Sequence, residues 1–205
     1  MWILWTAVTV VAGYLLGNLN GAIIASKLLG DDVRTHGSGN AGLTNFIRSY
    51  GANHALLVIL IDAGKGVLAC VLGGFLLRFR FGFPAGAAVG GVAVMLGHML
   101  PVFFGFHGGK GILTGLFVAL TVDYRVALLI LVVFAAFYFP TKYVSLSSVM
   151  ASVAFAVGFV IFHYHNPVTM GCGIFMGIMA VFMHRPNILR LMKGQETKTD
   201  LFKKI

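Results

Sequence analysis

The chain has 205 residues, of which 59% are hydrophobic and 10% charged, and its 15 Lys and Arg residues against 6 acidic residues give a formal net charge of +9. This composition excludes a soluble globular domain, whose surface carries far more Lys, Glu and Asp. Long unbroken apolar runs instead predict an all-α integral membrane protein, because the strands of a membrane β-barrel alternate apolar and polar residues.

Apolar runs predict about seven transmembrane helices in a single membrane domain that covers residues 1–205. They lie near residues 2–24, 52–77, 82–104, 111–122, 126–140, 144–162 and 167–183. Crossing a hydrocarbon core takes about 20 apolar residues, so the fourth and fifth runs are short. One kinked helix, or short helices flanked by re-entrant backbone, are alternatives there. The first run has no basic residues before it, which favours a retained helix over a cleaved signal.

Basic residues divide unequally between the two sides that seven spans create. One side collects Lys27, Arg34, Arg48, Lys110, Lys142, Arg185, Arg190, Lys193, Lys198, Lys203 and Lys204, and the other collects Arg78, Arg80 and Arg125. Cytoplasmic loops carry the excess of Lys and Arg, so we predict an outside N-terminus and a cytoplasmic C-terminus. The same bias explains the net charge, and no basic and aromatic run resembles a nucleic-acid surface.

Three polar, glycine-bearing segments open on the predicted cytoplasmic side, at residues 37–48, 105–114 and 184–196. The first reads GSGNAGLTNFIR, and its candidate phosphate-binding residues are Gly37, Ser38, Gly39, Asn40, Asn45 and Arg48. Glycines let backbone N–H groups converge on an anion, and an arginine can hold a phosphate with two hydrogen bonds. A capped turn followed by an arginine that sets topology is the alternative.

The second segment, FGFHGGKGILTG, has the features of a phosphate-binding loop. Bare backbone donors at Gly108, Gly109 and Gly111 flank the ammonium group of Lys110, and Thr114 lies in the first turns of a helix. The Walker A pattern requires Ser or Thr directly after the lysine, and Gly111 stands there, so nucleotide hydrolysis is not supported. A flexible loop with a topogenic lysine is the alternative.

The third segment, HRPNILRLMKGQETK, places His184 and Asn187 three residues apart, on one face of a continuing helix. A histidine at a membrane edge beside these loops is a general-base candidate, and the basic residues after it are expected to face lipid headgroups. Inside the second span, Asp62 and Lys65 are expected to form a structural ion pair, with direct catalysis as the alternative. The two cysteines show no metal-ligand spacing, so no metal site is predicted.

In their order and spacing, GSGNAGLTNFIR, GHMLPVFFGFHGGKGILT and HRPNILRLMKGQE resemble the three motifs of the bacterial acyl-phosphate:glycerol-3-phosphate acyltransferases, the PlsY family. YLLGNLNGAIIASK, IDAGKG and YVSLSS also resemble segments of that family, so the resemblance spans nearly the whole chain. The chain departs from the family pattern at Leu43, at Ile112 and Leu113, and at Asn18 and Asn20. The bulkier leucines change the shape expected of the acyl or glycerol pocket.

The resemblance implies transfer of a fatty acyl group from acyl phosphate to the sn-1 hydroxyl of glycerol 3-phosphate, with lysophosphatidic acid and phosphate as products. The enzyme would lie in the bacterial plasma membrane, contact membrane lipids, face the cytoplasm with its active site, and use no cofactor and no acyl-CoA. Carried over by position, the catalytic residues are Ser38, Arg48, Lys110, His184 and Asn187, and the supporting residues are His98, Ser145, Glu196, Asp62 and Lys65. The residues alone also allow a small transporter of an organic phosphate.

Overall fold

The computed structural model describes residues 1–199, so Lys203, Lys204 and the end of the predicted 1–205 domain lie outside the described residues. The helices are α1 (Trp2–Gly17), α2 (Gly21–Leu28), α3 (Leu43–Tyr50), α4 (Ala55–Phe81), α5 (Phe83–Met99), α6 (Ile112–Val122), α7 (Tyr124–Thr141), α8 (Val144–His163), α9 (Pro167–Met183) and α10 (Arg185–Met192). Two 3₁₀ turns, η1 (Val33–Thr35) and η2 (Val102–Phe104), lie between them.

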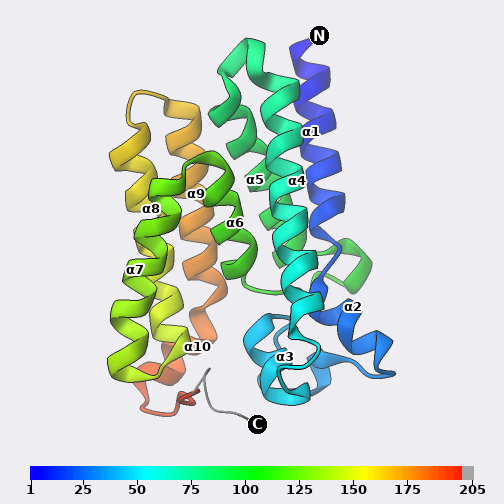
Figure 1. The fold of residues 1–205 in the computed structure, drawn as a ribbon, viewed down its shortest axis with the longest axis vertical. Helices are drawn as coiled ribbons and strands as arrows, with labels where there is room; N and C mark the ends of the chain where they lie inside the picture. The colour runs from blue at the N-terminus through cyan, green and yellow to red at the C-terminus, as the bar shows by residue number, and fades with distance from the viewer. Residues whose placement is uncertain (200–205) are drawn as a thin grey trace.

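The long helices form two groups, which are joined by α6 and by the packing of α5 against α9. Helices α1, α4 and α5 pack together, α7 packs on α8 and α8 on α9, and α6 contacts α4, α5 and α7. Figure 1 shows α2, α3 and α10 at one end of the bundle and the N-terminus at the other. We call the first of these ends the motif end, because residues 37–48, 105–111 and 184–196 lie there.

Close packing of α5 against α1 and α4 depends on glycine. A Cβ atom at Gly90 would lie 2.1 Å from the carbonyl oxygen of Ala69 in α4, and one at Gly97 would lie 2.1 Å from that of Tyr14 in α1. Small residues let membrane helices approach until their backbones touch, where packing and not water exclusion drives association. These two positions therefore fix how α5 fits between its neighbours.

The integral all-α class is confirmed, whereas seven full spans are not. By length and hydropathy, residues 2–28, α4, residues 83–104, α7 and α8 qualify as spans, and α9 with α10 makes a sixth that is bent by 53°. Helix α6 has 11 residues, or about 16 Å, roughly half of a ~30 Å core. The chain turns at Asp123, whose carboxylate accepts a hydrogen bond from the backbone N–H of Arg125 and caps α7. Since α7 then returns, the three segments still share one end.

The predicted first span, 2–24, is broken between α1 and α2, and the ion pair expected in α4 lies against the break. Lys65 and Asp62 are both buried with Nζ and Oδ1 2.8 Å apart. Lys65 also donates to the carbonyl oxygens of Gly17 at 3.2 Å and Leu19 at 2.8 Å, and Asp62 accepts from the N–H of Gly21 at 3.1 Å. The pair thus replaces helix hydrogen bonds that the break removes, which makes irregular backbone tolerable there.

Candidate active site

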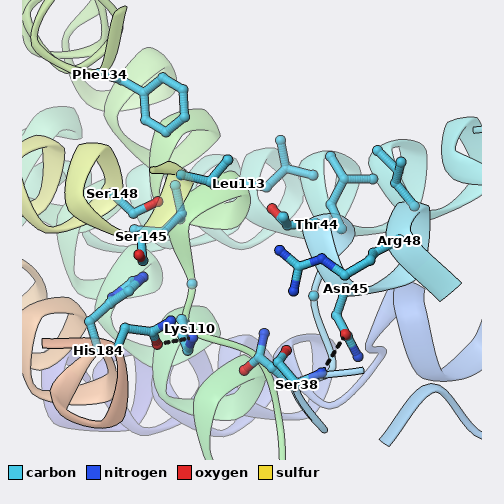
Figure 2. A pocket seen from close by; sticks show the side chains of 18 of the residues that line it. Ser38, Thr44, Asn45, Arg48, Lys110, Leu113, Phe134, Ser145, Ser148 and His184 are labelled. Carbon is cyan, nitrogen blue, oxygen red and sulfur yellow. Dashed lines mark hydrogen bonds between the residues drawn. The ribbon is translucent and has the colours of Figure 1, made fainter. Parts of the chain in front are cut away.

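A cavity of about 620 Å³ opens at the motif end and has a polar part and an apolar part. We call the polar part the floor; the side chains lining it include Ser38, Asn40, Arg48, Lys110, Ser145, His184, Asn187, Arg190 and Glu196. We call the apolar part the arm; it is lined by Leu113 and Leu116 of α6 and by Ile130, Leu131 and Phe134 of α7. Figure 2 shows Phe134 and Leu113 on one side of the cavity and Ser38, Lys110 and His184 on the other.

Four helices begin at this cavity, and all four leave their first backbone N–H groups without a side-chain cap. The N-cap residues are Gly42 for α3, Gly111 for α6, Tyr143 for α8 and His184 for α10. Uncapped N–H groups and the positive end of the helix dipole attract anions. The floor is therefore built to receive negative charge, and only the N-terminus of α6 was foreseen from the sequence.

Charged side chains of the floor form a connected network. Lys110 Nζ donates to Asn187 Oδ1, and the Asn187 amide donates to Glu196 Oε1 at 2.8 Å. Arg190 Nε donates to Glu196 Oε2 at 2.7 Å. Arginine 190 was expected at the lipid headgroups, but it lies in the cavity wall, one helical turn after Asn187 and on the same face.

Burial and neighbouring charges in the floor shift the pKa values of Lys110 and Glu196. Burial, and after it the positive charge of Arg190, lowers the pKa of Lys110 to about 8, although Glu196 opposes the shift. Burial also raises the pKa of the Glu196 carboxyl, but hydrogen bonds from Asn187 and Arg190 outweigh it, so the pKa stays below its usual value. Glu196 is thus ionised at neutral pH, and the floor still carries an excess of positive charge from Arg48, Lys110 and Arg190.

His184 is 3% exposed and stands at the bend between α9 and α10. Its Nδ1 lies 2.8 Å from the carbonyl oxygen of Ala180. A carbonyl only accepts hydrogen bonds, so Nδ1 carries the proton and Nε2 keeps a lone pair. Pro186 lies in the first turn of α10, where a proline needs no N–H donor, and Asn187 follows within the same turn.

In the first segment, Asn45 holds the loop. Its Oδ1 accepts from the N–H of Ser38 at 2.9 Å, and its Nδ2 donates to the carbonyl oxygens of Val33 and His36, each at 3.0 Å. Gly37 has φ +56°, and a Cβ there would lie 2.4 Å from Asn45 Oδ1, so only glycine fits. The Asn45 amide is therefore engaged with backbone. The side chains that this segment presents to the cavity are those of Ser38 and Arg48 (Figure 2).

Two predicted phosphate-binding glycines have a packing role. A Cβ at Gly108 would lie 2.0 Å from the carbonyl oxygen of His98, and one at Gly109 would lie 2.2 Å from His98 Nε2. The opposite ring atom, Nδ1, is 2.8 Å from Lys65 Nζ. His98 thus connects the buried ion pair of α4 to the loop that carries Lys110.

The structure brings most of the predicted site residues to one cavity. Those that line it are Gly37, Ser38, Asn40, Asn45, Arg48, Asp62, His98, Lys110, Gly111, Ser145, His184, Asn187 and Glu196, and those that do not are Gly39, Lys65, Gly108, Gly109 and Thr114. Sequence reasoning missed Arg190, Thr44 and Ser148, which also line it. The spacing of Arg190 from Asn187, and of Ser148 from Ser145, was the available signal, since residues three apart share a helix face.

The chain is similar to glycerol-3-phosphate acyltransferases over nearly its full length. The model of the family described as glycerol-3-phosphate acyltransferase matches residues 7–194. A protein of that name from Thermoanaerobacter sp. (strain X514) is 38% identical over 95% of this chain and 96% of its own length. One from Finegoldia magna is 40% identical over 90% of this chain and 91% of its own.

Two solved structures are similar in fold. The crystal structure of PlsY (YgiH), an integral membrane glycerol 3-phosphate acyltransferase, in its glycerol 3-phosphate form has a TM-score of 0.86 and 34% identity, covering 97% of this chain and 99% of that one. Its lysophosphatidic acid form has a TM-score of 0.81 and 36% identity, with 95% of each chain covered.

Proposed function

The chain belongs to the glycerol-3-phosphate acyltransferase family, and on that premise we propose that its acyl donor is acyl phosphate and its acceptor the sn-1 hydroxyl of glycerol 3-phosphate. The products are then lysophosphatidic acid and inorganic phosphate, which makes the reaction an acylation step of phospholipid synthesis. One observation carries the proposal: a single cavity joins a cationic floor, surrounded by four helix N-termini, to an apolar arm.

This cavity suits the proposed pair of substrates. Each substrate has a phosphate, so their joint binding requires more positive charge than one phosphate does, and Arg48, Lys110 and Arg190 supply it together with the helix N-termini. An acyl chain is apolar and fits the arm. Leu131 of α7 lines the arm and is 48% exposed, which supports entry of the chain from the bilayer.

The proposed reaction needs positioning and charge neutralisation more than a strong base. The glycerol hydroxyl oxygen bonds to the carbonyl carbon, and the bond from that carbon to the phosphate oxygen breaks, so phosphate leaves with the electron pair. Acyl phosphate is a mixed anhydride, and its phosphate is a good leaving group. Holding both substrates in line and neutralising their charge can therefore supply most of the acceleration. Two groups are available for the hydroxyl proton: Nε2 of His184 and a phosphate oxygen of the substrate.

Purified protein in detergent tests the donor. With radiolabelled glycerol 3-phosphate, we expect lysophosphatidic acid from palmitoyl phosphate and none from palmitoyl-CoA. Detergent solution has no compartments, so product formation also excludes transport as the activity. Product from palmitoyl-CoA alone would overturn the donor, and no product from either donor would overturn acyl transfer by this chain.

Lys110 and Arg48 are expected to neutralise the substrate phosphates. Lys110→Ala and Arg48→Ala should each lower kcat/KM by about 10²-fold or more, because each removes a charge-assisted contact. Arg48→Lys should remain impaired, since an ammonium cannot make the two parallel hydrogen bonds of a guanidinium. Lys193→Ala, an exposed lysine outside the cavity, is the matched control. Normal specific activity in the Lys110 and Arg48 variants would contradict the prediction that these residues neutralise the substrate phosphates.

The pH dependence of kcat/KM tests whether Lys110 acts through its positive charge. Its ammonium form is present below a pKa of about 8 and is lost above it, so kcat/KM should fall as pH rises through about 8. Substrate phosphates lose their second proton near pH 6 and do not change in that range. In Lys110→Arg the guanidinium stays charged, so this alkaline fall should disappear. A fall that persists in Lys110→Arg would assign it to another group.

His184→Gln distinguishes the two proton acceptors. Glutamine keeps a hydrogen bond but takes no proton, and activity should fall in either case because the side chain lies in the floor. Loss of about 10²-fold or more in kcat, together with loss of the acid limb of the kcat profile, assigns the proton to the imidazole. A raised KM with kcat within tenfold of the wild type assigns it to the substrate phosphate.

We also propose that the motif end faces the cytoplasm of a bacterial plasma membrane, in line with the excess of basic residues there. In a background without Cys70 and Cys172, single cysteines at positions 36 and 107 of the motif end should stay unreactive to an impermeant thiol reagent in intact cells. A cysteine at position 82, between α4 and α5 at the other end, should react. Labelling at 36 and 107 but not at 82 would reverse the orientation.

A further inference from the structure

Arg48 is held by a residue near the end of the chain that the mechanism above does not use. Figure 2 shows the guanidinium of Arg48 turned from α3 toward the open space of the cavity. The side chain is exposed and lies in the last turn of an eight-residue helix. Its Nη2 donates to the hydroxyl oxygen of Thr199 at 2.5 Å, and within residues 1–199 this is the one hydrogen bond that the guanidinium makes. The direction of the guanidinium therefore depends on Thr199.

Thr199 is itself fixed by the end of α7. Its backbone N–H donates to the carbonyl oxygen of Lys142 at 2.9 Å, and its backbone carbonyl accepts from the Tyr138 hydroxyl at 3.2 Å. It is partly buried and does not line the cavity. Because both contacts to α7 use backbone groups, the side chain is left to present its hydroxyl to Arg48.

Residues 195–199, which we call the strap, carry this contact across the motif end. The chain turns back after α10 at Gly194, where φ is +65°. Glu196 then ties the strap to the floor through Asn187 and Arg190. Helix α3 packs against α2 and α4, whereas α7 packs against α6 and α8. The contact between the strap and Arg48 therefore links the two groups of helices on either side of the cavity.

Thr199 orients Arg48 without using up its capacity for a phosphate. A guanidinium has five N–H donors in one plane, and the contact takes one of the two on Nη2. At least one pair of parallel N–H groups is left for two hydrogen bonds to a phosphate. The hydroxyl is also neutral, so it leaves the positive charge of Arg48 uncompensated, as a carboxylate in its place would not.

We propose that Thr199 is a positioning residue, which holds the Arg48 guanidinium in the direction that receives a substrate phosphate. The inference rests on the proposed function, in which Arg48 neutralises such a phosphate. Without Thr199 the exposed arginine would have to be ordered each time a substrate binds, and that ordering costs free energy. The cost applies equally to the bound substrate and the transition state, so its effect falls on KM and leaves kcat nearly unchanged.

The experiment measures kcat and both KM values, for palmitoyl phosphate and glycerol 3-phosphate, in the wild type, Thr199→Val, Thr199→Ser and Thr6→Val. Valine keeps the shape and the backbone contacts of Thr199 but has no acceptor, and serine keeps the hydroxyl. Thr6→Val is the matched control, because the Thr6 hydroxyl bonds its own helix at the carbonyl oxygen of Trp2.

We expect Thr199→Val to raise the KM of at least one substrate about tenfold, with kcat within threefold of the wild type. Thr199→Ser and Thr6→Val should stay near the wild type. Unchanged KM values in Thr199→Val, or a serine variant as impaired as the valine variant, would overturn the proposal. A lowered KM would also overturn it, because it would show that Thr199 competes with the substrate for Arg48.

A double-mutant cycle distinguishes positioning from a general effect on the strap. In an Arg48→Ala background, Thr199→Val should cause no further loss of kcat/KM, since the group that it positions is gone. An equal loss in both backgrounds would overturn the proposal. Thr199→Ala removes the same acceptor and takes the place of Thr199→Val in the cycle if the valine variant folds poorly.

Failure of the proposed function looks different from failure of this inference. In the first case the wild type would make no product from palmitoyl phosphate. An active wild type with an unaffected Thr199→Val would overturn the role of Thr199 alone.

Discussion

Asp62 and Lys65 carry opposite charges and are buried one turn apart in α4. Each is stabilised in the membrane bundle by the other and by hydrogen bonds with backbone groups. Isolated, each would be expensive at that depth, and removal of either partner would strand the other. Together they bind the carbonyl of Gly17 and the N–H of Gly21, on both sides of the break between α1 and α2. The break lets α2 turn at the motif end, and through His98 the same pair reaches the loop that carries Lys110.

The attraction of the cavity for anions depends on the helices that begin there. Helices α3, α6, α8 and α10 direct their N-termini at one space, and dipoles held by helix backbone need no reorganisation when an anion arrives. The floor lies at the motif end, while the arm is lined by α6 and α7. The proposed acceptor is water-soluble and the proposed donor is lipid-like, so a cavity with a polar floor and an apolar arm can hold both.

Features that depend on local sequence were predictable, and those that depend on tertiary contacts were not. Hydropathy and charge predicted the all-α membrane class, the ion pair in α4 and the meeting of three segments at one end. The packing role of Gly108 and Gly109, which lie in a loop, depends on contact with His98 of α5. Asn45 also holds backbone that precedes it by up to 12 residues, a structural role that composition did not indicate. The short reach of α6 was among the alternatives that run length suggested, but the choice between a full span and a half-length helix depended on how α7 packs back against it.

Burial and Arg190 lower the pKa of Lys110, so further cationic side chains would add little positive charge to the floor. Burial and Arg190 already bring this pKa to about 8. Another cationic side chain nearby would lower the pKa of Lys110 further, toward neutral pH, so Lys110 would lose the charge that the added side chain supplied. Helix N-termini avoid that limit, since partial charges on backbone N–H groups do not titrate. Glu196 acts in the same direction, because its carboxylate raises the pKa of Lys110 and holds Arg190 in place. Four N-termini and one carboxylate thus keep the floor attractive to anions with only three cationic side chains in it.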